Sequence, residues 1–280
     1  MSIRTQLSIS LSLIVLLAAS AMAQETFRLE YKFQKGKTYR YNAVSAGSMI
    51  QEMMGKEMKM ANGSNITTRM VVENTLPDGN IVMVASADSA RISSKSQMMD
   101  TTMVLGNIIG KKTRIVMSKL GTVLSREIID SVKSEAMFGG GTQRGMVSVT
   151  RLPGKEVKVG EVWTDVLIDT IESMGGKIYR RSNLEFTLTG KEDRSGHHCL
   201  KIGYTGTLAD TGKMAMGGME LYLEGNGKIK GTMYFDPKLG LTVYDEMTSD
   251  TEETMAVTGQ QNMTIPMSQS MKTTRVLLGD

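Results

Sequence analysis

The sequence predicts a mainly β protein, with antiparallel sheet folded as a sandwich or a curved half-barrel. Apolar and polar residues alternate along many segments, and turn residues separate those segments. The composition agrees, because 29 glycines and only 4 prolines suit strands joined by tight turns. One or two short helices complete the expected fold.

The expected strands follow from this alternation. Phe27, Leu29, Tyr31 and Phe33 alternate with charged residues, which gives a strand with one apolar face. The turn Pro77-Asp78-Gly79-Asn80 joins two more strands, because proline presets φ and glycine accepts positive φ. Strands are also expected at 70–76, 81–87, 163–171, 178–188, 199–208, 219–223, 228–235, 241–248 and 270–278.

Two stretches depart from the alternation. Apolar residues between 128 and 137 recur at helical spacing, and three glycines follow at 139–141, which predicts a helix near residues 127–138. The stretch Met98–Ile109 is strongly apolar and is the second helix candidate. Its apolar character indicates that it lies against a face of the sheet.

The first 23 residues have the pattern of a secretory signal peptide. Arg4 precedes the apolar run Leu11–Ala19, and Ala21-Met22-Ala23 forms a cleavage site. The run is too short to span a bilayer, and no second spanning segment follows. The expected protein is bacterial, exported to the periplasm or beyond, without a transmembrane span, and associated with a membrane at most peripherally.

The mature chain divides into two β halves, 24–150 and 151–280, which are either separate or one continuous domain. Both halves contain the same turn tripeptide, Lys119-Leu120-Gly121 in the first and Lys238-Leu239-Gly240 in the second. Turn-rich β sequences also produce such matches by chance, so duplication and coincidence both stay open.

Several of these segments resemble an uncharacterised family of exported, β-rich bacterial proteins, many of them lipoproteins. The segments that carry the resemblance are Lys35-Gly36-Lys37-Thr38-Tyr39-Arg40-Tyr41, Pro77-Asp78-Gly79, Lys158-Val159-Gly160-Glu161-Val162-Trp163, Tyr234-Phe235-Asp236 and Leu239-Gly240-Leu241. The resemblance implies a β fold and an exported location, and it implies no activity. The chain differs from the lipoproteins because its one cysteine, Cys199, is far from the cleavage site.

Composition and motifs exclude several function classes. The 33 basic and 29 acidic residues are interspersed, and no basic stripe with aromatic residues indicates nucleic-acid binding. No Gly-x-Ser-x-Gly elbow or phosphate-binding glycine loop occurs, so neither an enzyme nor a cofactor is expected. Asp165 and Asp169 share a strand face but lie roughly 13 Å apart, too far for a catalytic carboxylate pair.

Sulfur is the unusual feature, with 25 methionines in the chain. Thioethers, thiolates and imidazoles are soft or intermediate ligands, which makes a periplasmic copper site one hypothesis. Flexible methionines also fill gaps in a core, which is the simpler interpretation. The candidate metal ligands are Met49, Met53, Met54, Met58, Met60, His197 and Cys199.

The preferred functional hypothesis is a non-enzymatic envelope protein whose curved sheet binds an apolar, lipid-like ligand or a protein partner. The apolar stretch near residue 100 supplies the candidate ligand-binding residues, namely Met98, Met99, Met103, Leu105, Ile108 and Ile109. Copper binding is the first alternative. An uncharacterised hydrolase is the second, because the 29 acidic residues leave room for a carboxylate pair.

Overall fold

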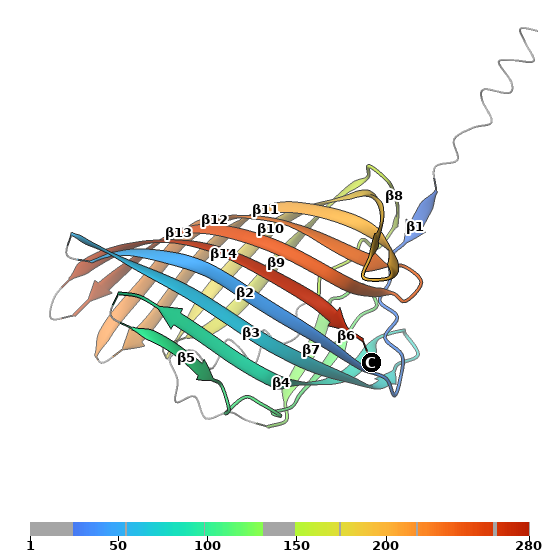
Figure 1. Ribbon diagram of the computed structural model, residues 1–280, viewed down its shortest axis with the longest axis horizontal. Coiled ribbons are helices and arrows are strands. Elements are labelled where there is room, and N and C mark those ends of the chain that lie inside the picture. The colour runs from blue at the N-terminus through green and yellow to red at the C-terminus, as the bar shows by residue number, and fades with distance from the viewer. Residues whose placement is uncertain are drawn as a thin grey trace, which may run out of the picture.

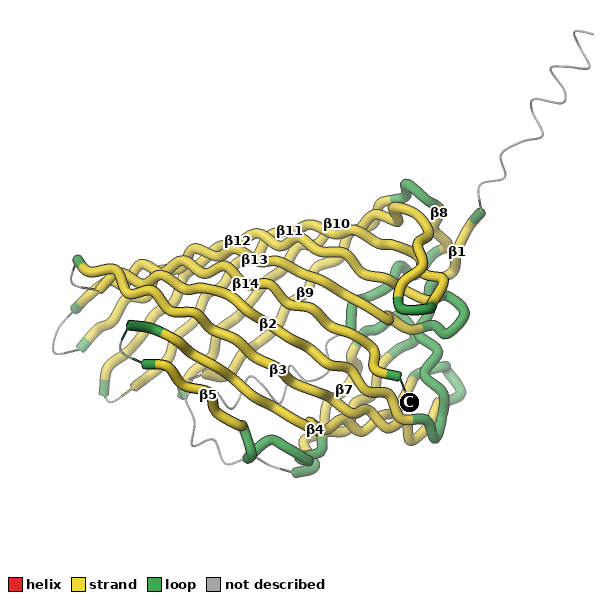
Figure 2. Tube along the Cα trace, in the orientation of Figure 1, coloured by secondary structure: helices red, strands yellow, loops and turns green. Residues whose placement is uncertain are grey.

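The computed structural model describes residues 25–279, apart from 54, 98, 131–148, 174, 217 and 260–261. The described residues form β-strands joined by turns and loops (Figures 1 and 2). The strands are β1 (Thr26–Arg28), β2 (Thr38–Met53), β3 (Lys56–Thr75), β4 (Ile81–Lys95), β5 (Asp100–Val104), β6 (Thr113–Met117), β7 (Val123–Ile128), β8 (Glu156–Lys158), β9 (Val162–Ser173), β10 (Gly176–Arg194), β11 (His197–Met216), β12 (Met219–Asp236), β13 (Leu241–Thr258) and β14 (Met263–Leu278).

Twelve strands form one antiparallel sheet in the order β7-β6-β4-β3-β2-β14-β13-β12-β11-β10-β9, with β5 also paired to β4. The sheet curves around an interior but is not closed, since β7 and β9 are its two ends (Figure 1). Strands β1 and β8 form a separate two-stranded sheet. The predicted mainly antiparallel β fold is therefore confirmed, as a single curved sheet.

The two faces of the sheet differ in character. Along β3, Thr68, Met70 and Val72 point inward and are buried, whereas Glu57 and Lys59 point outward and are exposed. Neighbouring strands come close together on the inner face. A Cβ on Gly227 would lie 2.6 Å from Thr251 Cγ2 and 2.7 Å from the Asp250 carbonyl oxygen. Glycine at such positions allows the sheet to curve tightly.

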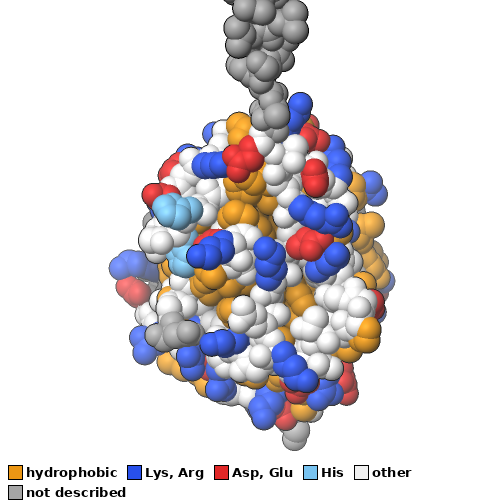
Figure 3. Space-filling model, turned by 90° about the vertical axis from the view of Figure 1, so that its right-hand side faces the viewer, with side chains coloured by type: hydrophobic (Ala, Val, Ile, Leu, Met, Phe, Trp, Pro, Cys, Tyr) orange, Lys and Arg blue, Asp and Glu red, His pale blue; other side chains and the backbone are white. Residues whose placement is uncertain are grey.

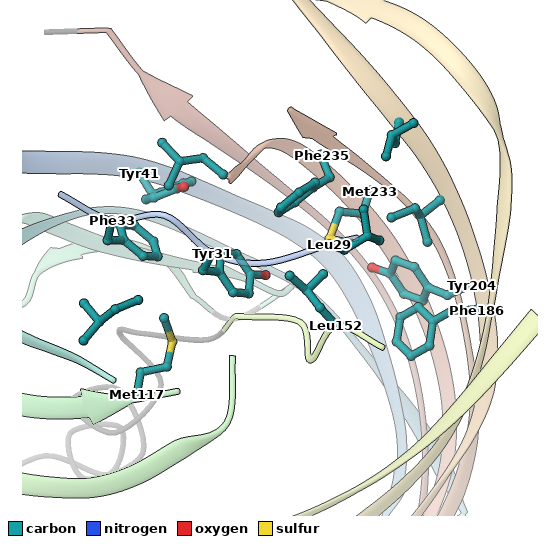
Figure 4. Packing of buried hydrophobic residues seen from close by; sticks show 14 of the residues in the cluster. Leu29, Tyr31, Phe33, Tyr41, Met117, Leu152, Phe186, Tyr204, Met233 and Phe235 are labelled. Carbon is teal, nitrogen blue, oxygen red and sulfur yellow. The ribbon is translucent and has the colours of Figure 1, made fainter. Parts of the chain in front are cut away.

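An extended segment, residues 29–33, crosses the interior at one end of the sheet, here called the base. Leu29, Tyr31 and Phe33 are 0–4% exposed and pack among inward-facing side chains such as Phe235 (Figure 4). We call residues 29–33 the plug segment. The predicted strand at this position is only partly observed, because β1 ends at Arg28 and the plug segment belongs to neither sheet.

Two turns hold the plug segment from opposite parts of the chain. The Tyr31 amide donates to the Lys119 carbonyl at 2.7 Å, and the Lys32 amide donates to the Gly240 carbonyl at 3.0 Å. These are the two turns that share the Lys-Leu-Gly tripeptide. Each tripeptide thus accepts one backbone hydrogen bond from the plug segment, the first through its lysine and the second through its glycine. Duplication of the halves stays a prediction.

The described residues contain no helix, so the helix predicted at 98–109 is wrong, whereas most of the helix predicted at 127–138 lies outside the described residues. Residues 127–128 end strand β7, and 131–138 lie outside the described residues. The second predicted helix is strand β5 followed by turns, with Arg91 opposite Val104. Leu105 and Ile108 lie after β5 and pack on Ala90. Residues in a loop can reach the same cluster without helical spacing, so the irregular spacing of the apolar residues fits this arrangement.

Candidate functional site

The methionines proposed as metal ligands lie at the end of the sheet opposite the base, here called the tip. Met49 is paired with Met60 across β2 and β3, and Met58 is paired with Gln51. All three methionines are half-buried on the inner face. Met53 pairs with Lys56 at the last turn of this hairpin, and Met54 lies outside the described residues.

His197 and Cys199 lie at the base, so the structure does not join them to these methionines. They begin β11, which has 20 residues and is therefore about 65 Å long at the usual rise per residue. His197 Nδ1 is 3.0 Å from Asp236 Oδ2, and His198 Nδ1 is 2.5 Å from Asp193 Oδ1. The histidines (pale blue in Figure 3) lie among charged side chains on this end of the molecule. Within the described residues, no three His, Cys, Asp or Glu side chains form a metal-binding group.

Cys199 faces a cavity of about 540 Å³ at the base, whose lining also includes Phe27, Leu200 and Pro237. Its side chain is buried, and burial raises the pKa of the thiol to about 11, with the charge of Asp236 adding to the shift. Because the thiolate is the reactive species, the thiol is a packing group and is not a nucleophile.

We expect Cys199 to react with a disulfide reagent far more slowly in the folded protein than in the unfolded chain. At pH 8 only about one thousandth of the folded thiol is ionised, and burial restricts access to it. The measurement is the reaction rate with and without denaturing urea. Equal rates in both conditions would show that the thiol is accessible and activated.

The candidate ligand-binding residues near residue 100 divide between core and surface. Leu105 and Ile108 are buried and pack with Ile109 against Ile66 and Ile92 of the inner face. Met99 and Met103 are 50% and 42% exposed, and Met98 lies outside the described residues. Buried members of this stretch fill one wall of the interior, so the structure does not bring the five described residues together as a binding surface.

Sequence reasoning missed a row of polar side chains on the inner face. The register places Asp169 of β9 opposite Arg180 of β10, Arg180 opposite Asp210 of β11, and Asp210 opposite Gly225 of β12. Gly225 in turn faces Glu253 of β13. We call Asp169, Arg180, Asp210 and Glu253 the polar belt. Four strands therefore contribute charged groups at one level of the interior.

Arg180 and Asp210 form the fixed part of the polar belt. Arg180 Nε donates to Asp210 Oδ1 at 2.8 Å, and a terminal guanidinium nitrogen donates to Oδ2 at 2.6 Å. Asp210 is 2% exposed, so this two-bond pairing compensates a buried charge. The hydrogen bonds to Asp210 raise the pKa of Arg180, which stays a cation.

Glu253 is the unmatched member of the polar belt. Its side chain lies over Gly225, where a Cβ would come within 2.6 Å of Glu253 Cγ. Partial burial raises the pKa of this carboxyl, the charge of Asp210 raises it further, and Arg180 opposes the shift. No hydrogen bond to the Glu253 carboxyl occurs among the described residues. The carboxyl is therefore available to a positively charged or hydrogen-donating group.

Apolar clusters lie on both sides of the polar belt. Towards the tip, buried side chains from four strands pack together, and half-buried methionines 255, 263 and 267 extend the cluster. Towards the base, Trp163 stacks on Phe186 with ring centroids 5.6 Å apart. The polar belt thus lies between an apolar cluster at the tip and stacked aromatic rings towards the base. The buried members at the tip are Met214, Leu221, Leu223, Val257 and Ile265.

The raised pKa of Glu253 predicts a dependence of stability on pH. A carboxyl with a higher pKa in the folded state binds its proton more tightly there, so ionisation at neutral pH lowers the free energy of unfolding. We expect Glu253→Gln to stabilise the protein at pH 7, and the gain to disappear as the pH falls below the pKa of the unfolded carboxyl.

Urea unfolding at several pH values measures this effect, with Glu252→Gln as the matched control. Glu252 is the next residue along β13 and points outward into solvent. A gain that is the same at pH 7 and pH 3, or that also appears in the control, would contradict the role given to Glu253.

Comparisons with known proteins identify no family. No family model matches the chain, and no curated protein matches it. Among solved structures, the chain resembles Pseudomonas aeruginosa OccK5 (OpdH), with 5% identity, a TM-score of 0.27 and coverage of 88% of this chain and 99% of the other. It also resembles an outer membrane channel from Pseudomonas putida F1, with 9% identity, a TM-score of 0.26 and coverage of 89% and 98%. A likeness at this level carries no argument about activity.

These structures do run against two predictions made from the sequence. The matched structures include an outer membrane channel. We therefore do not take further the predicted binding of an apolar ligand, of a partner or of copper, nor the predicted lack of a transmembrane span. In the described residues, no helix is both long and apolar enough to cross a membrane.

Proposed function

We propose that the protein is exported to the bacterial envelope and takes part in the movement of small, positively charged solutes. These solutes bind at the polar belt. The observation that carries this proposal is the Glu253 carboxyl, which has no hydrogen-bond partner in the described part of the chain and faces the interior beside Asp210. The belt holds three carboxyl groups against one guanidinium. A cation would compensate this excess of negative charge.

The signal-peptide pattern of residues 1–23 supports export, and the resemblance to exported bacterial proteins supports the same location. A non-enzymatic role is supported by the state of the reactive side chains. The pKa of Cys199 is raised to about 11, so its thiol is not poised as a nucleophile.

Binding of butylammonium tests the proposal, with butanol as the uncharged control. Calorimetry should detect butylammonium binding, and Glu253→Gln should weaken it by about tenfold or more, because a charge-assisted hydrogen bond is lost. Glu252→Gln should bind as the unaltered protein does. Equal binding of butanol and butylammonium, or unchanged affinity in Glu253→Gln, would overturn the proposal.

Uptake of radiolabelled butylamine by bacterial cells tests the role in movement. A strain lacking the protein should take up the amine more slowly, and the unaltered gene or the Glu252→Gln gene should restore the rate. The Glu253→Gln gene should not. Restoration by Glu253→Gln would show that the polar belt has no part in this movement.

A further inference from the structure

A second cavity, independent of the polar belt, lies where the start of β9 meets two other segments. It has a volume of about 400 Å³ and is lined by Trp163 and Asp165 from β9, by Leu120 from the β6–β7 turn, and by Arg151 and Leu152. The Leu152 amide donates to the Leu120 carbonyl at 2.8 Å, which holds the two segments together. We call this space the seam cavity.

Trp163 brings an unused hydrogen-bond donor to the seam cavity. The residue is 9% exposed, and its indole nitrogen has no hydrogen-bond partner among the described residues. A buried donor without a partner costs about 1–3 kcal/mol. Stacking on Phe186 at an interplanar angle of 11° fixes the indole in this position. The donor is therefore held in place, and its hydrogen bond is left for another molecule.

Asp165 brings a carboxylate from the same strand face, two residues further along β9. Its Oδ2 atom is buried and lies 2.9 Å from Arg151 Nε, but it lacks a well-aligned hydrogen bond within the described part of the chain. A second guanidinium nitrogen of Arg151 donates to the Val166 carbonyl at 2.5 Å. One wall of the cavity thus carries an indole donor without a partner and a carboxylate whose close contact is the ion pair with Arg151.

The charges around the seam cavity are balanced within the protein. Arg151 is paired with Asp165, and Lys155 Nζ lies 2.5 Å from Glu161 Oε1. A charged ligand would upset this balance, whereas a neutral ligand adds no charge to it. The remaining wall includes the apolar side chains of Leu120 and Leu152.

We propose that the seam cavity binds a small, neutral primary amide with a short apolar body. A primary amide carries a carbonyl acceptor and an N–H donor side by side, which complements the indole N–H of Trp163 and the carboxylate of Asp165. Its apolar body packs against Leu120 and Leu152. The indole nitrogen of Trp163 and Oδ2 of Asp165 are shielded from solvent. The side chain of Arg151, which is 33% exposed, therefore swings outward to admit the ligand.

Tryptophan fluorescence tests this site directly, because Trp163 is the only tryptophan in the chain. Isovaleramide should change the emission with a saturable dependence on concentration. Methyl isovalerate, which lacks the N–H donor, and isovalerate, which is charged, should each bind about tenfold or more weakly. No saturable change with the amide, or tighter binding of isovalerate, would overturn the proposal.

A variant with altered charge balance provides a second, independent readout. Asp165→Asn leaves Arg151 without its partner, so the preference between the two ligands should move from isovaleramide towards isovalerate. Glu185→Gln, an exposed outward position opposite Thr164 in the next strand, should keep the preference for the amide. An unchanged preference in Asp165→Asn would show that the carboxylate does not face the ligand.

Discussion

Replacing Gly240 with alanine is expected to lower the free energy of unfolding by about 3 kcal/mol. Gly240 has φ +67°, a conformation that costs an L side chain roughly 1–2 kcal/mol. A Cβ would also lie 2.5 Å from Lys32 Cγ and 2.7 Å from the Lys32 backbone nitrogen. The plug segment would have to move away from the turn that accepts its hydrogen bond. Urea unfolding monitored by circular dichroism measures the loss.

Gly36→Ala is the matched control for the steric part of this effect. Gly36 has φ +78°, but nothing lies within 4 Å of the position that an added Cβ would take. This variant should therefore lose only the conformational cost of roughly 1–2 kcal/mol. If both variants lose the same stability, then crowding between residue 240 and the plug segment contributes nothing to the loss.

Phe235→Ala should destabilise the protein by about 3–5 kcal/mol, the usual range for a fully buried aromatic residue. Phe235 is 0% exposed, and its ring contacts Tyr31 of the plug segment edge-on, with centroids 5.8 Å apart. Truncation would leave a void between the sheet and the plug segment. The midpoint of urea unfolding should fall while its slope stays unchanged.

Tyr222→Ala, in the same strand, is the control for loss of an aromatic ring. Tyr222 points outward and is 40% exposed, so its truncation should cost far less than that of Phe235. A loss below about 1 kcal/mol in Phe235→Ala would mean that the plug segment collapses onto the sheet and fills the void.

Much of the fold follows from local sequence patterns. Alternation predicted strands at these places but not their length: the predicted strand 70–76 is only the end of β3, and the predicted strands 219–223 and 228–235 are parts of β12. The helix over 127–138 was predicted from apolar spacing and from the three glycines that follow it. Residues 127–128 instead extend the pairing of β7 with β6, where Arg114 faces Glu127. Pairing with the preceding strand fixes these two residues, and it cannot be seen in the sequence of the segment itself.

The candidate sites were harder to predict, because they depend on register. Arg180, Asp210 and Glu253 lie on three different strands. Only the pairing of those strands brings their charged side chains to one level. The methionines of residues 49–60 were recognised as a group, and Met49 and Met60 do face each other. His197 and Cys199 were grouped with them by ligand chemistry, although a whole strand length separates the two ends of the sheet.

The pairing of β14 with β2 has a consequence for the order of folding. Leu278 lies opposite Arg40, so the middle of the sheet joins residues from the two ends of the chain. Contacts between such distant residues form slowly, because a long loop must close first. During synthesis, β2 exposes an unpaired edge until the last strand emerges, and exposed edges promote aggregation. This edge of β2 is therefore covered only once β14 pairs with it.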